Sequence, residues 1–194
     1  PHCVRSFVNE AEKRDGYFTE DVASAKKQAS LIDRFSNFPK IGRRKVSALR
    51  GVNQAEIDAF LNRFMPIAQA EHEKYNIPIS IILANALLQS KAGTNPLAQA
   101  QYNYFALPCS ANWKGTLHWQ NGNCYRQYEK AWTSFRDHSL YLTTGPNVNL
   151  LQLGNDYKAW AKAIEALDYS PIPRLANQLI EVIQKLNLQQ LDVE

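Results

Sequence analysis

The fold is decided by residues 77–98, which read IPISIILANALLQSKAGTNPLA. Pro78 suits a first helical turn, where its missing N–H costs nothing. The residues after it are apolar on nearly every face, which is typical of a helix at the centre of a core. Gly93 provides a natural stop. The segment therefore predicts a buried helix over 78–91, and its polar end, Gln89, is expected to face a cleft.

Further helices are expected on both sides of this segment. Asn53 and Glu56 form a capping-box pattern, and apolar residues then recur at helical spacing as far as Tyr75. Two alternating runs, 115–119 and 124–128, flank an Asn-Gly pair and predict a β-hairpin. The other predicted helices cover residues 94–101, 133–143, 156–167 and 173–188. The fold class is therefore mainly α (α+β), with one small hairpin.

The first 52 residues differ from the rest in charge. They carry 11 Lys or Arg against 6 Asp or Glu, whereas residues 53–194 carry 11 against 12. We expect a basic, partly helical extension over 1–52 and a folded domain over 53–194. Basic runs such as Arg43-Arg44-Lys45 usually form a solvated surface, with contact to an anionic polymer or lipid headgroups as the alternative. The run is too short and too poor in aromatic residues to indicate nucleic acid.

Composition excludes some classes of function. There is no run of 18 apolar residues, so no transmembrane segment is expected. No cofactor motif stands out. The four histidines show no ligand spacing with one another or with cysteine, so no metal site is expected; they are His2, His72, His118 and His138.

The apolar segment and its surroundings resemble the glucosaminidase family of cell-wall hydrolases (glycoside hydrolase family 73). The shared residues run through Ile77-Pro78, Ser80, Leu83-Ala84, Leu88, Ser90, Gly93, Leu97-Ala98 and Asn103-Tyr104-Phe105-Ala106-Leu107, and then through 134–139 and 157–161. The resemblance covers residues 53–190. It implies a lysozyme-like fold, peptidoglycan or its fragments as the partner, and a periplasmic or otherwise exported location in the cell envelope.

The cysteines fit that location. Envelope members of the family often carry cysteines at the places of Cys109 and Cys124, so the resemblance implies a disulfide between them and an oxidising compartment. A disulfide between two cysteines 15 positions apart would contribute about 3 kcal/mol to the free energy of unfolding. The alternative is a pair of buried thiols in a cytosolic protein. Cys3 is left over.

The sequence departs from the family where the chemistry should be. The catalytic glutamate falls on Gln89, and an amide cannot protonate a leaving oxygen. The family's hairpin acid is replaced by the neutral stretch 121–123, and Leu175 stands in place of a tyrosine. No Asp or Glu occurs between Glu73 and Glu129. These losses predict a catalytically inactive domain.

The aromatic residues of the family's sugar groove are retained. An aromatic ring can stack on the C–H face of a sugar, and Lys91 beside Gln89 would favour the carboxylates of peptide stems. Phe105 is assigned to the core. The residues expected to bind glycan are Gln89, Lys91, Tyr102, Tyr104, Trp113, Trp119 and Tyr125.

Three hypotheses follow. The first is an inactive glucosaminidase-like envelope protein that binds peptidoglycan glycan or docks on an envelope protein complex. The second is an active peptidoglycan β-N-acetylglucosaminidase, with Gln89 introduced in place of glutamate or with an unexpected acid. The third is a scaffold or regulatory subunit without a glycan role, which would use residues 1–52 to hold an envelope protein.

Overall fold

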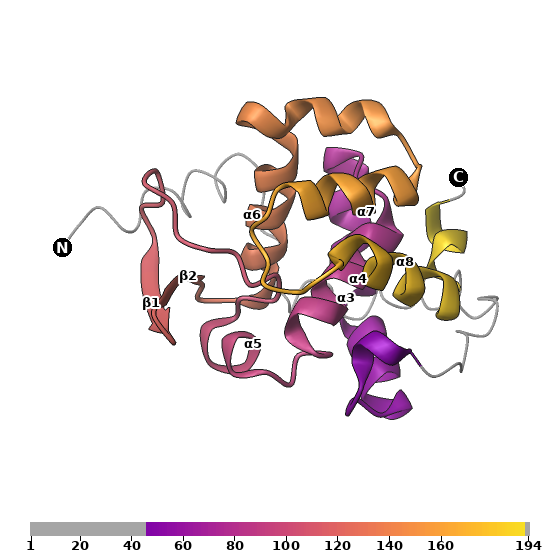
Figure 1. Ribbon diagram of the computed structural model, residues 1–194, viewed down its shortest axis with the longest axis horizontal. Helices are drawn as coiled ribbons and strands as arrows, with labels where there is room; N and C mark the ends of the chain where they lie inside the picture. The colour runs from indigo at the N-terminus through magenta and orange to yellow at the C-terminus, as the bar shows by residue number, and fades with distance from the viewer. Residues whose placement is uncertain (1–45, 193–194) are drawn as a thin grey trace.

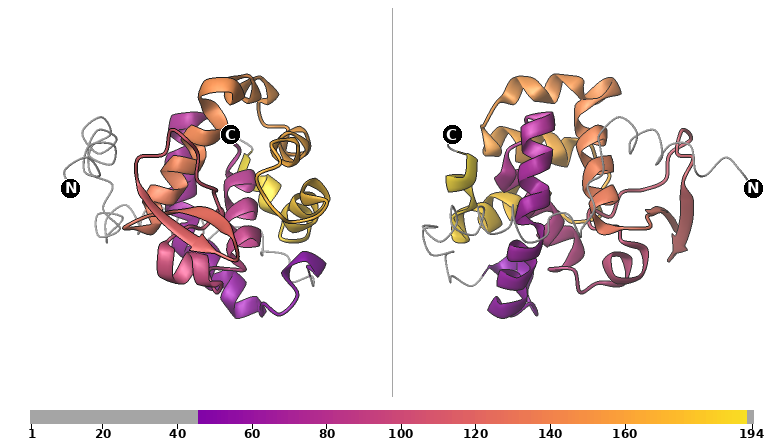
Figure 2. Two further views of the ribbon diagram at one scale, coloured as in Figure 1. Left: turned by 60° about the vertical axis from the view of Figure 1, so that its left-hand side comes forward. Right: turned by 180° about the vertical axis from the view of Figure 1, so that it is seen from behind.

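A computed structural model describes residues 46–192, in which helices surround the central helix α4 (Figure 1). Helix α3 packs along α4 and crosses the back of the body (Figure 2, right). Helices α7 and α8 also contact α4. The elements are η1 Ser47–Leu49, α3 Gln54–Tyr75, α4 Ile79–Ser90, α5 Pro96–Gln101, β1 Thr116–Gln120, β2 Asn123–Gln127, α6 Ala131–Thr143, η2 Gly145–Leu153, α7 Tyr157–Ala166, α8 Leu175–Lys185 and η3 Leu188–Asp192.

Helix α4 is buried along its whole length, as the sequence predicts, and this includes its polar residues. Pro78 lies at the N-cap, one position before the first turn in which it was expected. The carboxylate of Asp192 closes this end, because it accepts the Ser80 N–H at 2.9 Å and also the Ser80 hydroxyl. At the other end Lys91 takes a left-handed conformation, with φ of 50°.

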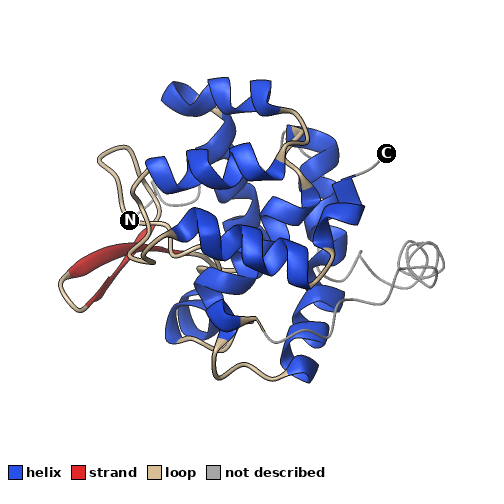
Figure 3. Ribbon diagram, turned by 45° about the vertical axis from the view of Figure 1, so that its right-hand side comes forward, coloured by secondary structure: helices blue, strands red, loops and turns tan. Residues whose placement is uncertain are grey.

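The hairpin projects from the helical body (Figure 3). Its strands pair antiparallel with His118 opposite Tyr125, and the turn residues Asn121 and Gly122 both have positive φ, as a two-residue type I′ turn requires. Segment 107–109 attaches the hairpin to the body, because it exchanges backbone hydrogen bonds with β2 on the side away from β1.

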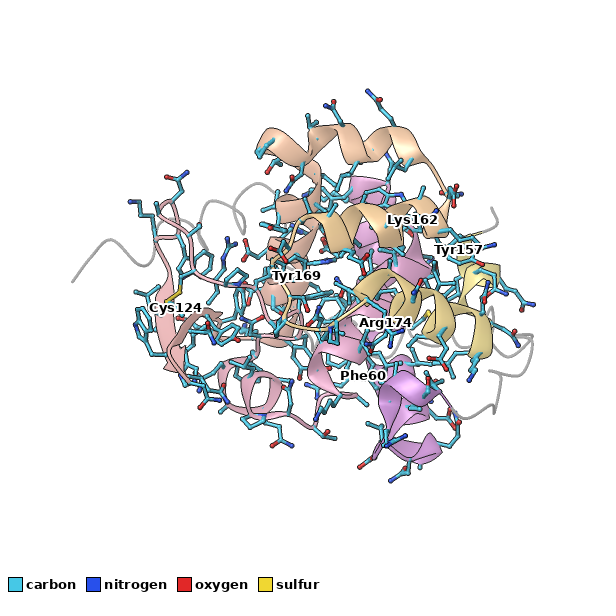
Figure 4. All side chains as sticks on the ribbon, in the orientation of Figure 1. Phe60, Cys124, Tyr157, Lys162, Tyr169 and Arg174 are labelled. Atoms are coloured by element: carbon cyan, nitrogen blue, oxygen red, sulfur yellow. A yellow bond between two sulfur atoms is a disulfide. The ribbon has the colours of Figure 1, made fainter. Side chains whose placement is uncertain are left out.

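Two residues of this attachment are the predicted disulfide partners. The structure joins Cys109 to Cys124, whose Cα atoms are 5.4 Å apart (Figure 4). The Cys109 N–H also donates to the Cys124 carbonyl at 3.0 Å. The loop between them carries Trp113 and is therefore closed at its base.

The core contains an aromatic cluster between α3, α6 and the segment before the hairpin. Phe105 is fully buried, as expected, and meets Phe135 edge to face at 4.9 Å. Tyr104 is also in the core, 4% exposed, with its ring 4.7 Å from that of Phe64. Tyr104 therefore does not lie on an open groove in this structure, and its contact with glycan stays a prediction. Its ring fills the space between α3 and α6.

Other expectations on the elements need adjustment. Val46 and Leu49 are buried in the core, so the folded body begins at or before Val46 and not at residue 53. Helix α6 begins at Ala131, two residues before the expected cap, and Thr133 donates its hydroxyl back to Lys130. The rest of the extension, residues 1–45, lies outside the described residues. Within residues 46–192, no helix is long and apolar enough to span a membrane.

Candidate functional site

Gln89 lies in the last turn of α4 and is 5% exposed. Its Nε2 is 2.9 Å from Ser170 Oγ, and its Oε1 is 3.1 Å from the same hydroxyl. Ser170 belongs to the loop that follows α7, so this loop covers the amide. The expectation that Gln89 faces an open cleft is wrong, because its side chain is buried and its amide is hydrogen-bonded to Ser170. Glycan contact by Gln89 stays a prediction.

Gln89 belongs to a buried polar cluster that we call the Gln89 cluster, made of Asn85, Gln89, His138, Tyr169 and Ser170. The Asn85 amide donates to the Tyr169 hydroxyl at 2.8 Å and lies 3.0 Å from His138 Nε2. Burial lowers the pKa of His138 to about 3 and raises the pKa of Tyr169. Every member of the cluster is therefore uncharged at neutral pH.

Carboxylates on the neighbouring elements are engaged elsewhere. Asp137 on α6 accepts from Arg126 Nη1 at 2.7 Å and from the Tyr128 hydroxyl. Glu71 on α3 accepts from Arg136 Nε at 3.0 Å. Asp168 is exposed and directly precedes Tyr169.

The other two family positions give no acid either. Leu175 is 2% exposed and packs in the core, and the hairpin turn 121–123 is exposed and neutral. Glu129, just past the hairpin, is exposed. Within residues 46–192, no group of three His, Cys, Asp or Glu side chains could hold a metal ion.

An open pocket of about 510 Å³ lies beside the Gln89 cluster, between the loop before the hairpin and α6. The indole of Trp113 meets Tyr128 edge to face at 5.6 Å, and the Arg126 guanidinium lies 4.9 Å from the Trp113 ring centroid. We call it the aromatic pocket. The lining residues that matter below are Trp113, Arg126, Tyr128, Trp132, Asp137 and Tyr141.

Tyr169 separates the two sites. Its ring meets the pocket residue Tyr141 edge to face at 5.5 Å, while its hydroxyl reaches back to Asn85. Figure 4 shows Tyr169 on the loop beside α6, on the side of the body that faces the hairpin. A ligand in the aromatic pocket would therefore meet Tyr169 before it could reach Gln89.

The structure distributes the predicted glycan residues over several places. Trp113 lines the aromatic pocket. Tyr102 and Trp119 are exposed outside it, at 38% and 67%, and Tyr125 is half-buried on β2. Lys91 is exposed at the end of α4. Glycan contact by these four residues stays a prediction.

Sequence reasoning missed most of the pocket. Asp137 and Tyr141 are four residues apart on α6, so they share one face of that helix, and this spacing was a usable signal. Tyr128 lies before α6, so helical spacing does not link it with Trp132. Nothing in the local sequence indicates that Tyr169 and Ser170 fold over Gln89.

Comparison with known proteins places the chain. The model of the family described as "Glucosaminidase: Mannosyl-glycoprotein endo-beta-N-acetylglucosaminidase" matches residues 65–188. The exo-glucosaminidase LytG of Bacillus subtilis is 28% identical over 155 residues, which cover 71% of this chain and 54% of LytG. The peptidoglycan hydrolase FlgJ of Escherichia coli K12 is 26% identical over 144 residues, covering 66% of this chain and 46% of FlgJ. The chain thus spans about half the length of these relatives.

Solved structures agree on the fold. The catalytic domain of the autolysin Auto from Listeria monocytogenes superposes with a TM-score of 0.57 at 20% identity, covering 86% of this chain and 97% of that domain. The glycoside hydrolase domain of Salmonella typhimurium FlgJ superposes with a TM-score of 0.54 at 24% identity, covering 69% of this chain and 90% of that domain. The lysozyme-like fold expected from the sequence is confirmed.

Proposed function

This chain belongs to the glucosaminidase family, and from that membership we propose that it is a non-hydrolysing member that binds peptidoglycan glycan in the cell envelope. One observation carries the proposal. The position of the family's catalytic glutamate holds a buried amide, Gln89, which is hydrogen-bonded to Ser170 and surrounded by uncharged groups.

The absence of an acid at this position has a direct chemical consequence. Cleavage of a glycosidic bond needs a carboxylic acid that protonates the leaving oxygen, and usually a second carboxylate for the water or the sugar. Each such contribution is worth roughly 10²–10⁴-fold in rate. Asp137 and Glu71 cannot substitute without giving up their arginine partners.

The aromatic pocket supports the binding half of the proposal. Its volume of about 510 Å³ suits a ligand of one or two sugar rings. The ring of Trp113 offers an apolar face for sugar C–H groups, and Arg126 and Asp137 supply polar atoms beside it. The buried Trp132 Nε1–H has no hydrogen-bond partner in the described part of the chain, so a small movement of the wall would let a sugar oxygen satisfy it.

The first experiment measures binding and turnover on the same substrate. Wild-type protein should sediment with purified peptidoglycan and release no reducing ends during a long incubation. Trp113→Ala should weaken sedimentation about tenfold, because it removes the stacking face. Tyr157→Ala, which alters an aromatic residue on the far side of the body (Figure 4), should leave it unchanged. Equal binding by all three proteins would contradict the pocket as the glycan site.

Steady release of reducing ends would instead revive the enzyme hypothesis. The exposed Asp168, next to the loop that covers Gln89, would then be the residue to replace with asparagine. Loss of release in Asp168→Asn would identify it as the unexpected acid.

A second experiment restores the carboxyl at the family position. Gln89→Glu should give no robust turnover, because the hairpin and Leu175 positions still lack their groups. The new carboxyl would be buried without a cation among the hydrogen-bond partners that Gln89 has in residues 46–192, so we expect a raised pKa and a loss of about 2–3 kcal/mol of unfolding free energy at neutral pH. The loss should shrink as the pH falls and the carboxyl becomes protonated.

The matched control is Gln99→Glu, which makes the same change at an exposed position on α5 and should be close to neutral. Fast peptidoglycan hydrolysis by Gln89→Glu alone would refute the proposal.

A further inference from the structure

Among residues 46–192, strand β1 has one unpaired edge. In a two-residue hairpin the residues next to the turn form a hydrogen-bonded pair, so Gln120 bonds to Asn123, and His118 bonds to Tyr125 two positions further. The backbone groups of Leu117 and Trp119 consequently point away from β2. Strand β2 shows the same alternation, because the Cys124 carbonyl and the Arg126 N–H form hydrogen bonds with segment 107–109 and not with β1.

The free edge also carries the most exposed apolar side chains. Among the described large hydrophobic residues, Trp119 and Leu117 have the highest exposed fractions, 67% and 50%. Natural proteins usually protect an edge strand with charges, proline or a bulge. Strand β1, with the sequence TLHWQ, has no charged residue other than a titratable histidine and no proline, and its register with β2 is unbroken.

We propose that β1 pairs with β1 of a second copy of this chain, antiparallel about a two-fold axis through His118. In this register Leu117 faces the partner's Trp119, and Trp119 faces the partner's Leu117. Both positions present outward N–H and C=O groups, so the pairing makes four backbone hydrogen bonds. Each exposed leucine then lies beside an exposed tryptophan on one face of the joined sheet.

A second copy fits this edge because the pattern is self-complementary. The two outward-facing residues are placed symmetrically around His118, and the strand carries no fixed charge that would select a partner of opposite sign. Pairing of one short strand covers less surface than a standard interface of about 1,600 Å². We therefore expect a weak dimer, with a Kd on the order of 100 μM.

The first test is sedimentation equilibrium of the full chain over a range of concentrations. Wild type should dimerise, and Leu117→Pro should weaken the dimer at least tenfold, because proline removes an outward N–H without touching the β1–β2 bonds. Trp119→Lys should have the same effect by placing a charge on the edge. Val148→Asp changes another exposed apolar residue, on η2, and should leave the dimer intact.

The second test fixes the register. In a Cys3→Ser background, His118→Cys should cross-link two copies under mild oxidation, since directly opposed residues of a non-hydrogen-bonded pair have Cα atoms about 4.5 Å apart. Thr116→Cys should not, because its counterpart lies four positions away along the strands. A monomer at every concentration, a dimer that tolerates Leu117→Pro, or equal cross-linking by Thr116→Cys would overturn the proposal.

Discussion

The Gln89 cluster and the aromatic pocket meet where Tyr169, a member of the cluster, contacts the pocket residue Tyr141, and the two sites bury polar groups in opposite ways. The cluster contains amides, hydroxyls and a neutral imidazole, all inside the protein. The pocket holds a full ion pair, Arg126 with Asp137, on a wall that stays open. The first site is therefore satisfied internally, whereas the second leaves room for a ligand.

This difference supports the proposal that the chain does not hydrolyse glycan. An ionised carboxylate requires solvent, a cation or hydrogen-bond donors, and without them its pKa rises and it becomes protonated. An amide has no such requirement, and here a serine of the neighbouring loop closes over it. The pocket beyond Tyr169 does not depend on that acid and keeps its aromatic wall.

The largest effect is expected from breaking the pocket's ion pair. Asp137→Ala leaves the Arg126 guanidinium, with a side chain 9% exposed, without its carboxylate. We expect a loss of about 3 kcal/mol of unfolding free energy, measured by urea denaturation. Glu129→Ala removes an exposed carboxylate nearby and should stay within about 0.5 kcal/mol of wild type. Similar small losses in both variants would show that the pair is not desolvated.

An intermediate effect is expected from acid on the Gln89 cluster. The folded protein holds the pKa of His138 at about 3, against 6.5 ordinarily. Below pH 6.5 the histidine is protonated in the unfolded chain but stays neutral in the folded protein. The free energy of unfolding therefore falls as the pH drops toward 3. The free energy of unfolding falls by up to about 1.4 kcal/mol per pH unit. By pH 5 the total loss is about 2 kcal/mol.

The control for this slope is His138→Gln, which should be less stable overall but should lack this part of the pH dependence. Urea denaturation at pH 7, 6 and 5 compares the two proteins. Parallel curves would mean that His138 becomes protonated in the folded state, and the cluster would then not be neutral.

The smallest effect concerns the turn that follows Gln89. Lys91 has φ of 50°, a left-handed conformation that strains a residue with a Cβ. Lys91→Gly should raise stability by about 0.5–1 kcal/mol, measured as a shift in the urea midpoint. Lys158→Gly makes the same change inside α7 and should lower stability by about 1 kcal/mol. A loss in both variants would mean that the Lys91 side chain makes a contact worth more than the strain.

Local patterns predicted the scaffold well. The continuous apolar run placed α4 in the centre, the Asn53 and Glu56 capping box placed the start of α3, and the Asn-Gly pair placed the hairpin turn. Each of these signals acts over a few residues, so the sequence contains it directly.

The site was predicted less well because its walls come from distant segments. Tyr104 and Phe105 are neighbours in an aromatic stretch, and sequence could not show that both enter the core. Closure of Gln89 depends on Ser170, 81 residues away. Such contacts are set by how α7 and α6 pack, which local periodicity does not encode.

The contact between Ser80 and Asp192 has a consequence for biogenesis. The N-terminal end of α4 is capped by a residue 112 positions later in the chain. Because synthesis starts at the amino end, the residues of α4 are made early, but this end of the helix stays uncapped until residue 192 is available. The central helix therefore reaches its final contacts only after nearly all of residues 46–192 have been synthesised.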